Sequence, residues 1–280
     1  MKPSNLLVLA ACGLVTCFTS CKKDSSTLDA DSTIETTFEL SNENAAADYM
    51  TEEDNDLLME VTADQNLQGN GFAPTSSTDQ LIPCANVTVS AGGFPKTILI
   101  NFDSTCTSPR GLVRKGLVRI VVSDSLRRPG STAVMTFENY FVNGFKREAT
   151  STWRNTSIPP VRSWERKVEN GKITAPSGIF WLHQSIRNVT QTAGSSTPAM
   201  LDDVFSIAGN GSITRPGGVT RTATIIEPLQ KKYICANIDK GKIRFQGPNH
   251  FAVLNYGDGE CDRIATISID GRPPRTILLR

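Results

Sequence analysis

The residues that could bind a ligand gather in the middle of the chain, where tryptophans fall among basic side chains. Trp153 and Trp164 lie close in sequence to Arg162, Arg166 and Lys167. Aromatic rings stack on sugar rings, and basic side chains beside them bind carboxylates, phosphates or sulfates. The five residues predict a site for an acidic glycan or another anionic polymer, with Trp164 as the first contact. Because tryptophan is also common in protein cores, a structural role stays open for both rings.

Residues for catalysis or metal binding are harder to identify. The two histidines, His183 and His250, lie in separate segments with no nucleophile that can be named beside them, so no catalytic residue is assigned. Asp258, Glu260 and Asp262 form an acidic cluster that is an alternative calcium site, although Asp-Gly between two strands first predicts a hairpin turn. The sequence predicts a protein that is not an enzyme and that uses no cofactor.

The cysteines beyond the N-terminal segment are even in number, which is typical of disulfides in an oxidising compartment. Four cysteines allow three disulfide connectivities, and an internal repeat favours one of them. The sequence CANVTV at 84 and the sequence CANIDK at 235 each lead into an apolar strand and then to a closing cysteine. Each unit predicts a hairpin stapled across its base, and the two hairpins suggest an internal duplication, with chance similarity as the alternative. The predicted pairs are Cys84 with Cys106 and Cys235 with Cys261.

Residues 84–280 predict an all-β domain. They are rich in β-branched and aromatic residues with stretches of period-two alternation, and no helical pattern of ten residues interrupts them. Asn-Gly pairs that begin at Asn143, Asn170 and Asn210 suit tight hairpin turns and are expected between strands. The predicted fold is therefore mainly β, an antiparallel meander or β-sandwich with one N-terminal α-helix, which argues against the βαβ enzyme folds.

The segment before this domain differs in composition and in charge. Residues 21–43 are small and polar and predict a tether, and residues 44–67 predict one helix with apolar residues along one side. Residues 24–64 hold 13 acidic residues and no lysine or arginine, whereas residues 65–280 hold 26 basic and 15 acidic residues. Either the acidic helix lies against a basic face of the sheet, or the basic side chains form a surface for an anionic ligand. That surface would comprise Arg147, Arg154, Arg162, Arg166, Lys167 and Arg187.

The N-terminus has the features of a targeting segment. An apolar stretch of about ten residues follows Lys2 and is too short to cross a bilayer. The sequence Phe18-Thr19-Ser20-Cys21 resembles a lipobox, with Phe18 where leucine is usual. It predicts removal of a signal peptide, residues 1–20, and attachment of diacylglycerol and an acyl chain such as palmitate to Cys21, which anchors the protein in a membrane. A plain secretory signal that leaves Cys21 free is the alternative.

Three longer phrases resemble a group of uncharacterised outer-membrane lipoproteins from the Bacteroidota. These phrases are GFPKTILINFDSTC, RPGSTAVMTFENYFVNG and VLNYGDGECDRIATISIDG. The resemblance implies an outer-membrane location and an all-β body, and it brings no catalytic residue. The sequence after Cys21 matches a surface-export signal only in part, so the protein could face either the cell surface or the periplasm.

The predicted function is therefore a lipid-anchored envelope protein that binds an anionic glycan or polymer. The first alternative is a structural or assembly subunit whose partner is another envelope protein. The second is a polysaccharide hydrolase, for which the two carboxylates cannot be chosen without geometry. Nucleic acid is not an expected partner, because no nucleic-acid-binding motif is present.

Overall fold

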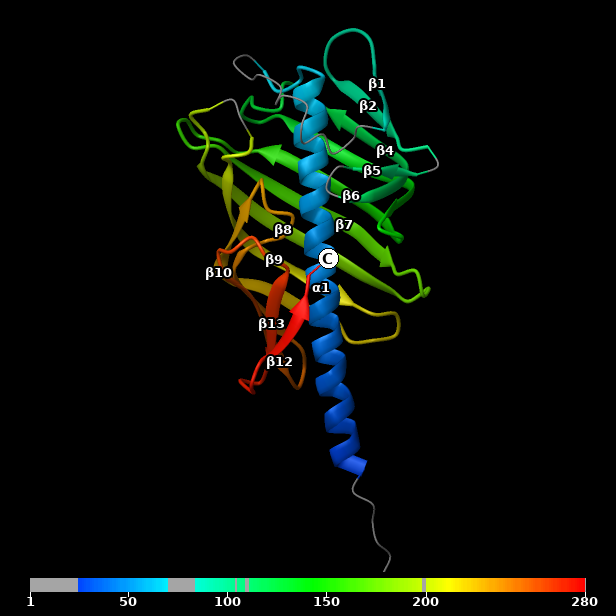
Figure 1. The fold of residues 1–280 in the computed structure, drawn as a ribbon, viewed down its shortest axis with the longest axis vertical. Coiled ribbons are helices and arrows are strands. Elements are labelled where there is room, and N and C mark those ends of the chain that lie inside the picture. The colour runs from blue at the N-terminus through cyan, green and yellow to red at the C-terminus, as the bar shows by residue number, and fades with distance from the viewer. Residues whose placement is uncertain (1–24, 70–83, 104, 109–110, 198–199, 280) are drawn as a thin grey trace, which may run out of the picture.

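One long helix and a single antiparallel sheet form the fold (Figure 1). The computed structural model describes residues 25–69, 84–103, 105–108, 111–197 and 200–279, with side chains from Ser32 on. The predicted signal peptide and the lipidation site Cys21 lie outside the described residues. The elements are α1 (Ser25–Asp64), β1 (Asn86–Val89), β2 (Lys96–Asn101), β3 (Cys106–Thr107), β4 (Val113–Val122), β5 (Thr132–Val142), β6 (Phe145–Asn155), β7 (Ser163–Thr174), β8 (Phe180–Ala193), β9 (Val204–Thr214), β10 (Arg221–Lys232), β11 (Lys240–Gln246), β12 (Phe251–Asp258), β13 (Ile264–Ile269) and β14 (Arg275–Leu278).

The sheet is a meander in which each strand pairs with the next one along the chain. Its order runs from β1 and β2 through β4 and onward to β14, while the short β3 pairs only with β4. All pairs are antiparallel, which confirms the predicted fold class. Within the described residues β1 and β14 are the two edges, so the sheet is open rather than closed on itself. The prediction allowed for a sandwich, and the structure shows a single curved layer.

The sheet curves strongly because its strands carry bulges and glycines inside their length. At the β4–β5 bulge Gly116 has φ of +99°, and a Cβ there would lie 2.1 Å from the carbonyl oxygen of Asn139. Such interruptions bend a strand and increase its twist. Of the three Asn-Gly pairs, only the one at Asn143 is a hairpin turn. The pairs at Asn170 and Asn210 lie within β7 and β9, so their prediction as turns is wrong.

Helix α1 lies on the concave face of the sheet, which curves around it (Figure 1). It has 40 residues and begins at Ser25, inside the segment predicted as a tether. The predicted apolar side, with Met50, Leu57 and Leu58, is buried. The acidic side chains from Glu52 to Glu60 are buried as well, because the sheet covers the helix on more than one side. Among the described residues, no helix combines the length and the hydropathy needed to cross a membrane.

Both predicted disulfides are present. Cys84 and Cys106 enclose the hairpin of β1 and β2, and Cys235 and Cys261 enclose the hairpin of β11 and β12. The sequence separations are 22 and 26 residues. Each bond therefore closes one antiparallel pair near its base, at opposite ends of the meander. The internal duplication that suggested this pairing stays a prediction.

Candidate functional site

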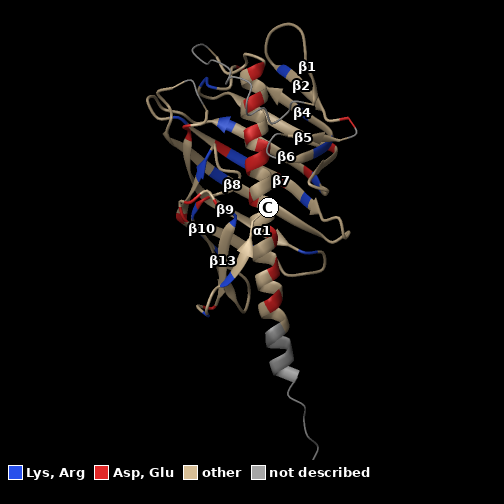
Figure 2. Ribbon diagram, in the orientation of Figure 1, with Lys and Arg blue, Asp and Glu red and all other residues tan. Residues whose placement is uncertain are grey.

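Acidic residues run along α1, and basic residues lie in the strands of the sheet behind it (Figure 2). Five ion pairs join them within 2.5 to 3.4 Å, and none of the ten side chains is more than 12% exposed. These pairs account for the charge asymmetry between the two parts of the chain. They form a helix–sheet ion network of Glu53 with Arg114, Asp54 with Arg147, Glu52 with Arg166, Asp48 with Arg187, and Asp56 with Lys231.

Further pairs continue along the helix towards its N-terminal end. Arg215, in the loop after β9, contacts Glu43 at 2.5 Å and Glu39 at 2.6 Å. Arg275 of β14 contacts Glu35 at 2.8 Å. From β7 to β14 the partners lie successively nearer the N-terminal end of α1, from Glu52 to Glu35. The exception is Lys231 of β10, which pairs with Asp56.

Burying the charges of the helix–sheet ion network is unfavourable in free energy. Moving charged groups out of water is unfavourable, and the attraction within each pair offsets that cost only in part. Burial raises the pKa of Asp54 although Arg147 lies beside it, and burial raises the pKa of Asp48 although Arg187 lies beside it. We interpret the network as fixing the register of the helix against the sheet more than as adding net stability.

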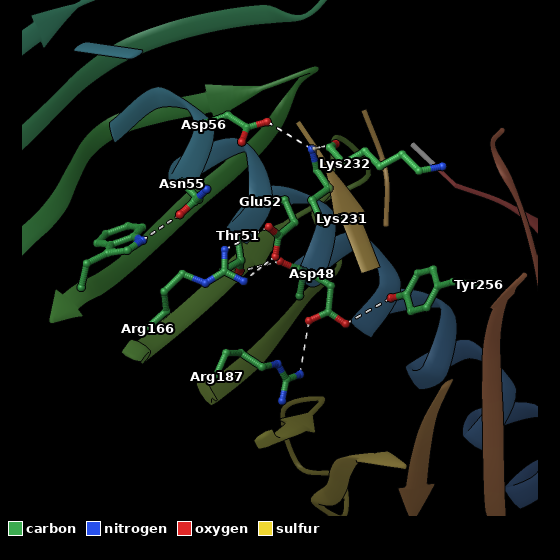
Figure 3. A network of polar contacts seen from close by, with 12 residues as sticks. Asp48, Thr51, Glu52, Asn55, Asp56, Arg166, Arg187, Lys231, Lys232 and Tyr256 are labelled. Atoms are coloured by element: carbon green, nitrogen blue, oxygen red, sulfur yellow. Dashed lines mark hydrogen bonds and ion pairs between the residues drawn. The ribbon is translucent and has the colours of Figure 1, made fainter. Parts of the chain in front are cut away.

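Two of the five predicted ligand-binding residues lie inside this core. Trp153 is 3% exposed, and its Nε1 donates to Asn55 Oδ1 at 3.2 Å. Arg166 is 2% exposed and donates to both carboxylate oxygens of Glu52, at 3.0 and 2.5 Å (Figure 3). Neither residue can belong to an exposed ligand surface, because the acidic helix covers both.

The same correction applies to two more of the predicted surface arginines, which lie near His183. Arg147 and Arg187 are buried beneath α1 as well. Arg147 Nη1 lies 2.6 Å from His183 Nε2, and burial and the two arginines lower the pKa of this histidine well below its usual value. A neutral imidazole accepts the arginine hydrogen, so His183 is a structural acceptor.

The other three predicted residues are placed apart from that core. Lys167 pairs with Glu169 at 2.8 Å, and both side chains are more than 40% exposed. Arg162 and Trp164 instead line a cavity at the end of the molecule where α1 ends. The ring of Trp164 meets Phe205 edge to face, with centroids 5.3 Å apart. The predicted set of five therefore lies in three different places.

The cavity, which we call the end cavity, has a volume of about 360 Å³. Pockets for small ligands usually have roughly 300–1,000 Å³ and a mostly apolar lining with a few polar groups. The end cavity has this character, since helix, strands and loops all contribute apolar side chains to it. These are Met59, Leu126, Trp164, Met200, Phe205 and Tyr233, with Pro129, Pro159, Pro160 and Val161.

Two arginines bring positive charge into the end cavity. Arg127 Nε donates to Gln68 Oε1 at 3.1 Å, and Arg162 Nη1 donates to Gln191 Oε1 at 3.5 Å. A glutamine amide oxygen thus accepts a hydrogen bond from each guanidinium group. Burial lowers the pKa of Arg127 to about 10, and the positive charge of Arg162 is the second cause. Arg127 therefore remains charged at neutral pH.

Asp203 is the one carboxylate among the described residues that line the end cavity. Gln191 Nε2 donates to its Oδ1 at 2.6 Å. Burial raises the pKa of Asp203 to about 7, with a further contribution from the charge of Asp202, while the two arginines and the glutamine act in the opposite direction. At neutral pH Asp203 is therefore only partly ionised. The ionisable groups that line the cavity leave it net positive.

The acidic cluster near the C-terminus gives no sign of a metal site. Asp258, Glu260 and Asp262 are all exposed, and Asp262 Oδ1 accepts a hydrogen bond from the backbone N–H of Ile264. Within the described part of the chain, the one group of ligand atoms close enough to hold an ion involves Cys235, Asp239 and Cys261. Its two sulfur atoms are joined in the disulfide, which removes them as thiolate ligands.

Sequence reasoning missed most of the end cavity. Arg127, Gln191 and Asp203 come from separate parts of the chain, and none lies in a recognisable motif. The alternation of β7 is the one local signal that could have separated the predicted residues, since Trp164 and Arg166 share one face of the strand while Lys167 lies on the other.

Comparison of the chain with protein-family models, with curated proteins and with solved structures found no match.

Proposed function

We propose that this protein is a lipid-anchored envelope protein that binds a small amphipathic anion in its end cavity. The observation that carries the proposal is the pair of arginines, Arg127 and Arg162, in a mostly apolar cavity whose one lining carboxyl group is partly protonated at neutral pH. The acidic group of a ligand would meet the arginines, and its apolar part would fill the remaining space.

This proposal narrows the ligand expected from the sequence. A long anionic polymer would need an extended basic surface, but Arg147, Arg166 and Arg187 are buried against α1. A cavity of about 360 Å³ suits a small molecule or the end of a larger one. Hydrolysis of a polysaccharide would need two carboxyl groups in the cavity, and only Asp203 lines its described part. Binding without chemical change is the simpler use of this site.

The sequence supports the anchored part of the proposal. The lipobox-like sequence that ends at Cys21 and the resemblance to outer-membrane lipoproteins both favour a lipid anchor in the outer membrane. Helix α1 follows closely and spans roughly 60 Å at 1.5 Å per residue. Met59, which lines the end cavity, lies near the other end of this helix. The anchor would therefore attach at the end of the molecule away from the cavity.

The edge strands favour the assembly subunit as a second candidate. In the described part of the sheet, β1 and β14 each have a neighbour on one side only, and Leu278 of β14 is 73% exposed. Unpaired edges can accept a strand from a partner. A ligand-sized cavity with two arginines is nevertheless the more specific feature, and it decides the order of the two candidates.

Binding of 8-anilinonaphthalene-1-sulfonate, an aromatic anion that fluoresces in apolar surroundings, tests the proposal on the purified protein. Arg162→Ala should weaken binding by roughly tenfold or more, because the anion loses a charged hydrogen-bond donor. Lys167→Ala is the matched control, since this basic residue lies on β7, just after Arg162 in the chain, but is exposed and paired with Glu169. Its affinity should match that of the wild type.

Cooperative urea unfolding of each variant is needed to show that the dye reports on a folded site. Equal affinities of the wild type and Arg162→Ala would refute binding in the end cavity. A selective loss with Lys167→Ala would favour the exposed strand surface that the sequence predicted.

A further inference from the structure

The end cavity opens at one end of the meander, among the loops that leave even-numbered strands. Because neighbouring strands from β4 to β12 are antiparallel, the loops after β6, β8 and β10 lie at the same end. All three contribute to the cavity, through Val161, Met200 and Tyr233 respectively.

Large apolar side chains are exposed on these same three loops. Ile158 is 79% exposed, Val161 50%, Leu201 40% and Ile234 59%. Val161 lines the end cavity, and each of the other three is next in sequence to a residue that lines it. Solvent-exposed aliphatic side chains therefore lie next to the end cavity, on loops that follow three different strands.

The charge beside the tip at Ile158 is positive. The loop after β4 carries Arg127 and Arg128, and the hairpin of β6 and β7 carries Arg154 and Arg162. Asp124, the one acidic residue in the loop from 123 to 131, pairs with Arg128 at 2.6 Å. The Arg128 side chain is 70% exposed, so its remaining donors face solvent. These two neighbouring loops therefore carry a clear excess of positive charge around an apolar tip.

We propose that the end-cavity face docks on a lipid bilayer that contains anionic phospholipid, across from the membrane that would hold the N-terminal anchor, with Ile158, Leu201 and Ile234 inserted among the headgroups. This inference builds on the proposed function, because it makes the amphipathic anion a lipid of that bilayer. The apolar part of such a lipid passes into the cavity without crossing water, and its acidic group meets Arg127 and Arg162. The exposed arginines at the rim bind the surrounding headgroups.

A bilayer fits this surface better than a folded protein does. The apolar residues stand on separate loop tips rather than on one flat face. Arg128 and Arg154 lie on the loop and the strand beside the tip at Ile158, whereas Asp202 is exposed beside Leu201. Aliphatic side chains that enter the interface, together with basic side chains at the headgroup level, are the features of peripheral membrane attachment. A protein interface would instead present a contiguous apolar core of good shape complementarity.

Insertion can be measured at the tip itself, so that attachment through the N-terminus does not confuse the result. Ile158→Trp places a fluorescent side chain at the proposed point of insertion. Val219→Trp is the matched control, because Val219 is 56% exposed in the loop after β9, at the opposite end of the meander. Vesicles of phosphatidylethanolamine and phosphatidylglycerol with brominated acyl chains quench tryptophans that enter the bilayer, and the quenching of the wild-type protein is subtracted from both.

The expected result is strong quenching and a blue shift of the added tryptophan in Ile158→Trp, with little change in Val219→Trp. Replacing phosphatidylglycerol with phosphatidylcholine should weaken the effect. No quenching at position 158, or stronger quenching at position 219, would overturn the proposal and leave the loop tips to a protein partner. Dye binding to the end cavity is measured without vesicles, so failure of docking and failure of ligand binding are distinguishable.

Discussion

Glu52→Gln is the sharpest perturbation of the helix–sheet ion network. The substitution keeps the shape of the side chain and removes its charge. Glu52 is 4% exposed and accepts two hydrogen bonds from Arg166, whose Nε has no partner among the described residues. The variant therefore leaves a buried guanidinium group without its counter-ion and with poorer acceptors.

Removing one partner of a buried pair typically costs about 3–5 kcal/mol, and we expect a loss of this size in the free energy of unfolding. For a chain of this length the melting temperature should fall by roughly 10 °C. Glu169→Gln is the control, because its pair with Lys167 is more than 40% exposed on both sides. An exposed pair contributes about 1 kcal/mol or less, so this variant should stay close to the wild type.

The double variant Glu52→Gln with Arg166→Met measures the interaction energy between the two side chains. Removing both charges leaves no uncompensated ion, so the double variant should lose at least about 2 kcal/mol less than the sum of the two single variants. Urea unfolding followed by tryptophan fluorescence, without reductant, measures all four proteins and the control. The reasoning is refuted if Glu52→Gln costs no more than Glu169→Gln, or if the two single losses simply add.

Two further predictions concern the end cavity and the first hairpin. Because burial raises the pKa of Asp203 to about 7, the folded state binds more protons than the unfolded state between about pH 4 and 7, and this group lowers stability as the pH rises through that window. Asp203→Asn should therefore be stabilised relative to the wild type at pH 8 more than at pH 5, and an unchanged difference would contradict the raised pKa. Replacing Cys84 and Cys106 with serine opens a loop of 22 residues and should lower the free energy of unfolding by about 3 kcal/mol, measured by urea unfolding without reductant; a loss under about 1 kcal/mol would show that the bond constrains the unfolded chain little.

The class of fold followed from the sequence because hydrophobic alternation is a local signal. Strands, disulfide pairing and an acidic helix could all be inferred from neighbouring residues. The curvature of the sheet could not, since it depends on where bulges and close backbone contacts fall. Gly171 shows why: a Cβ at this position would lie 2.4 Å from the carbonyl oxygen of His183 across the strand pair, and only the folded sheet shows this contact.

The candidate site was harder to predict from the sequence, for a related reason. Arg162 and Trp164 both belong to the predicted set, and both line the end cavity. Arg166 was grouped with them although it is engaged by Glu52, more than a hundred residues earlier. A single sequence gives the charge of a side chain, but the partner that neutralises it is known only once distant segments are placed together.

The descending order of ion pairs along α1 has a consequence for how the chain folds. The pair of Arg114 spans 61 residues, that of Arg166 spans 114 and that of Arg275 spans 240. Formed in isolation, each later pair would close a longer loop. Once β4 is in place, however, β7, β8 and β14 pair with helix residues that lie successively nearer the N-terminal end, whereas β10 pairs back at Asp56.

Folding can therefore proceed as a zipper in which every completed strand shortens the search of the next one, although the contacts are far apart in sequence. Glu35 acquires its partner from β14, the last strand described. A chain shortened at its C-terminus would leave this carboxylate without Arg275. Its N-terminal helix would then be the last element to become stable, although it is the first to be synthesised.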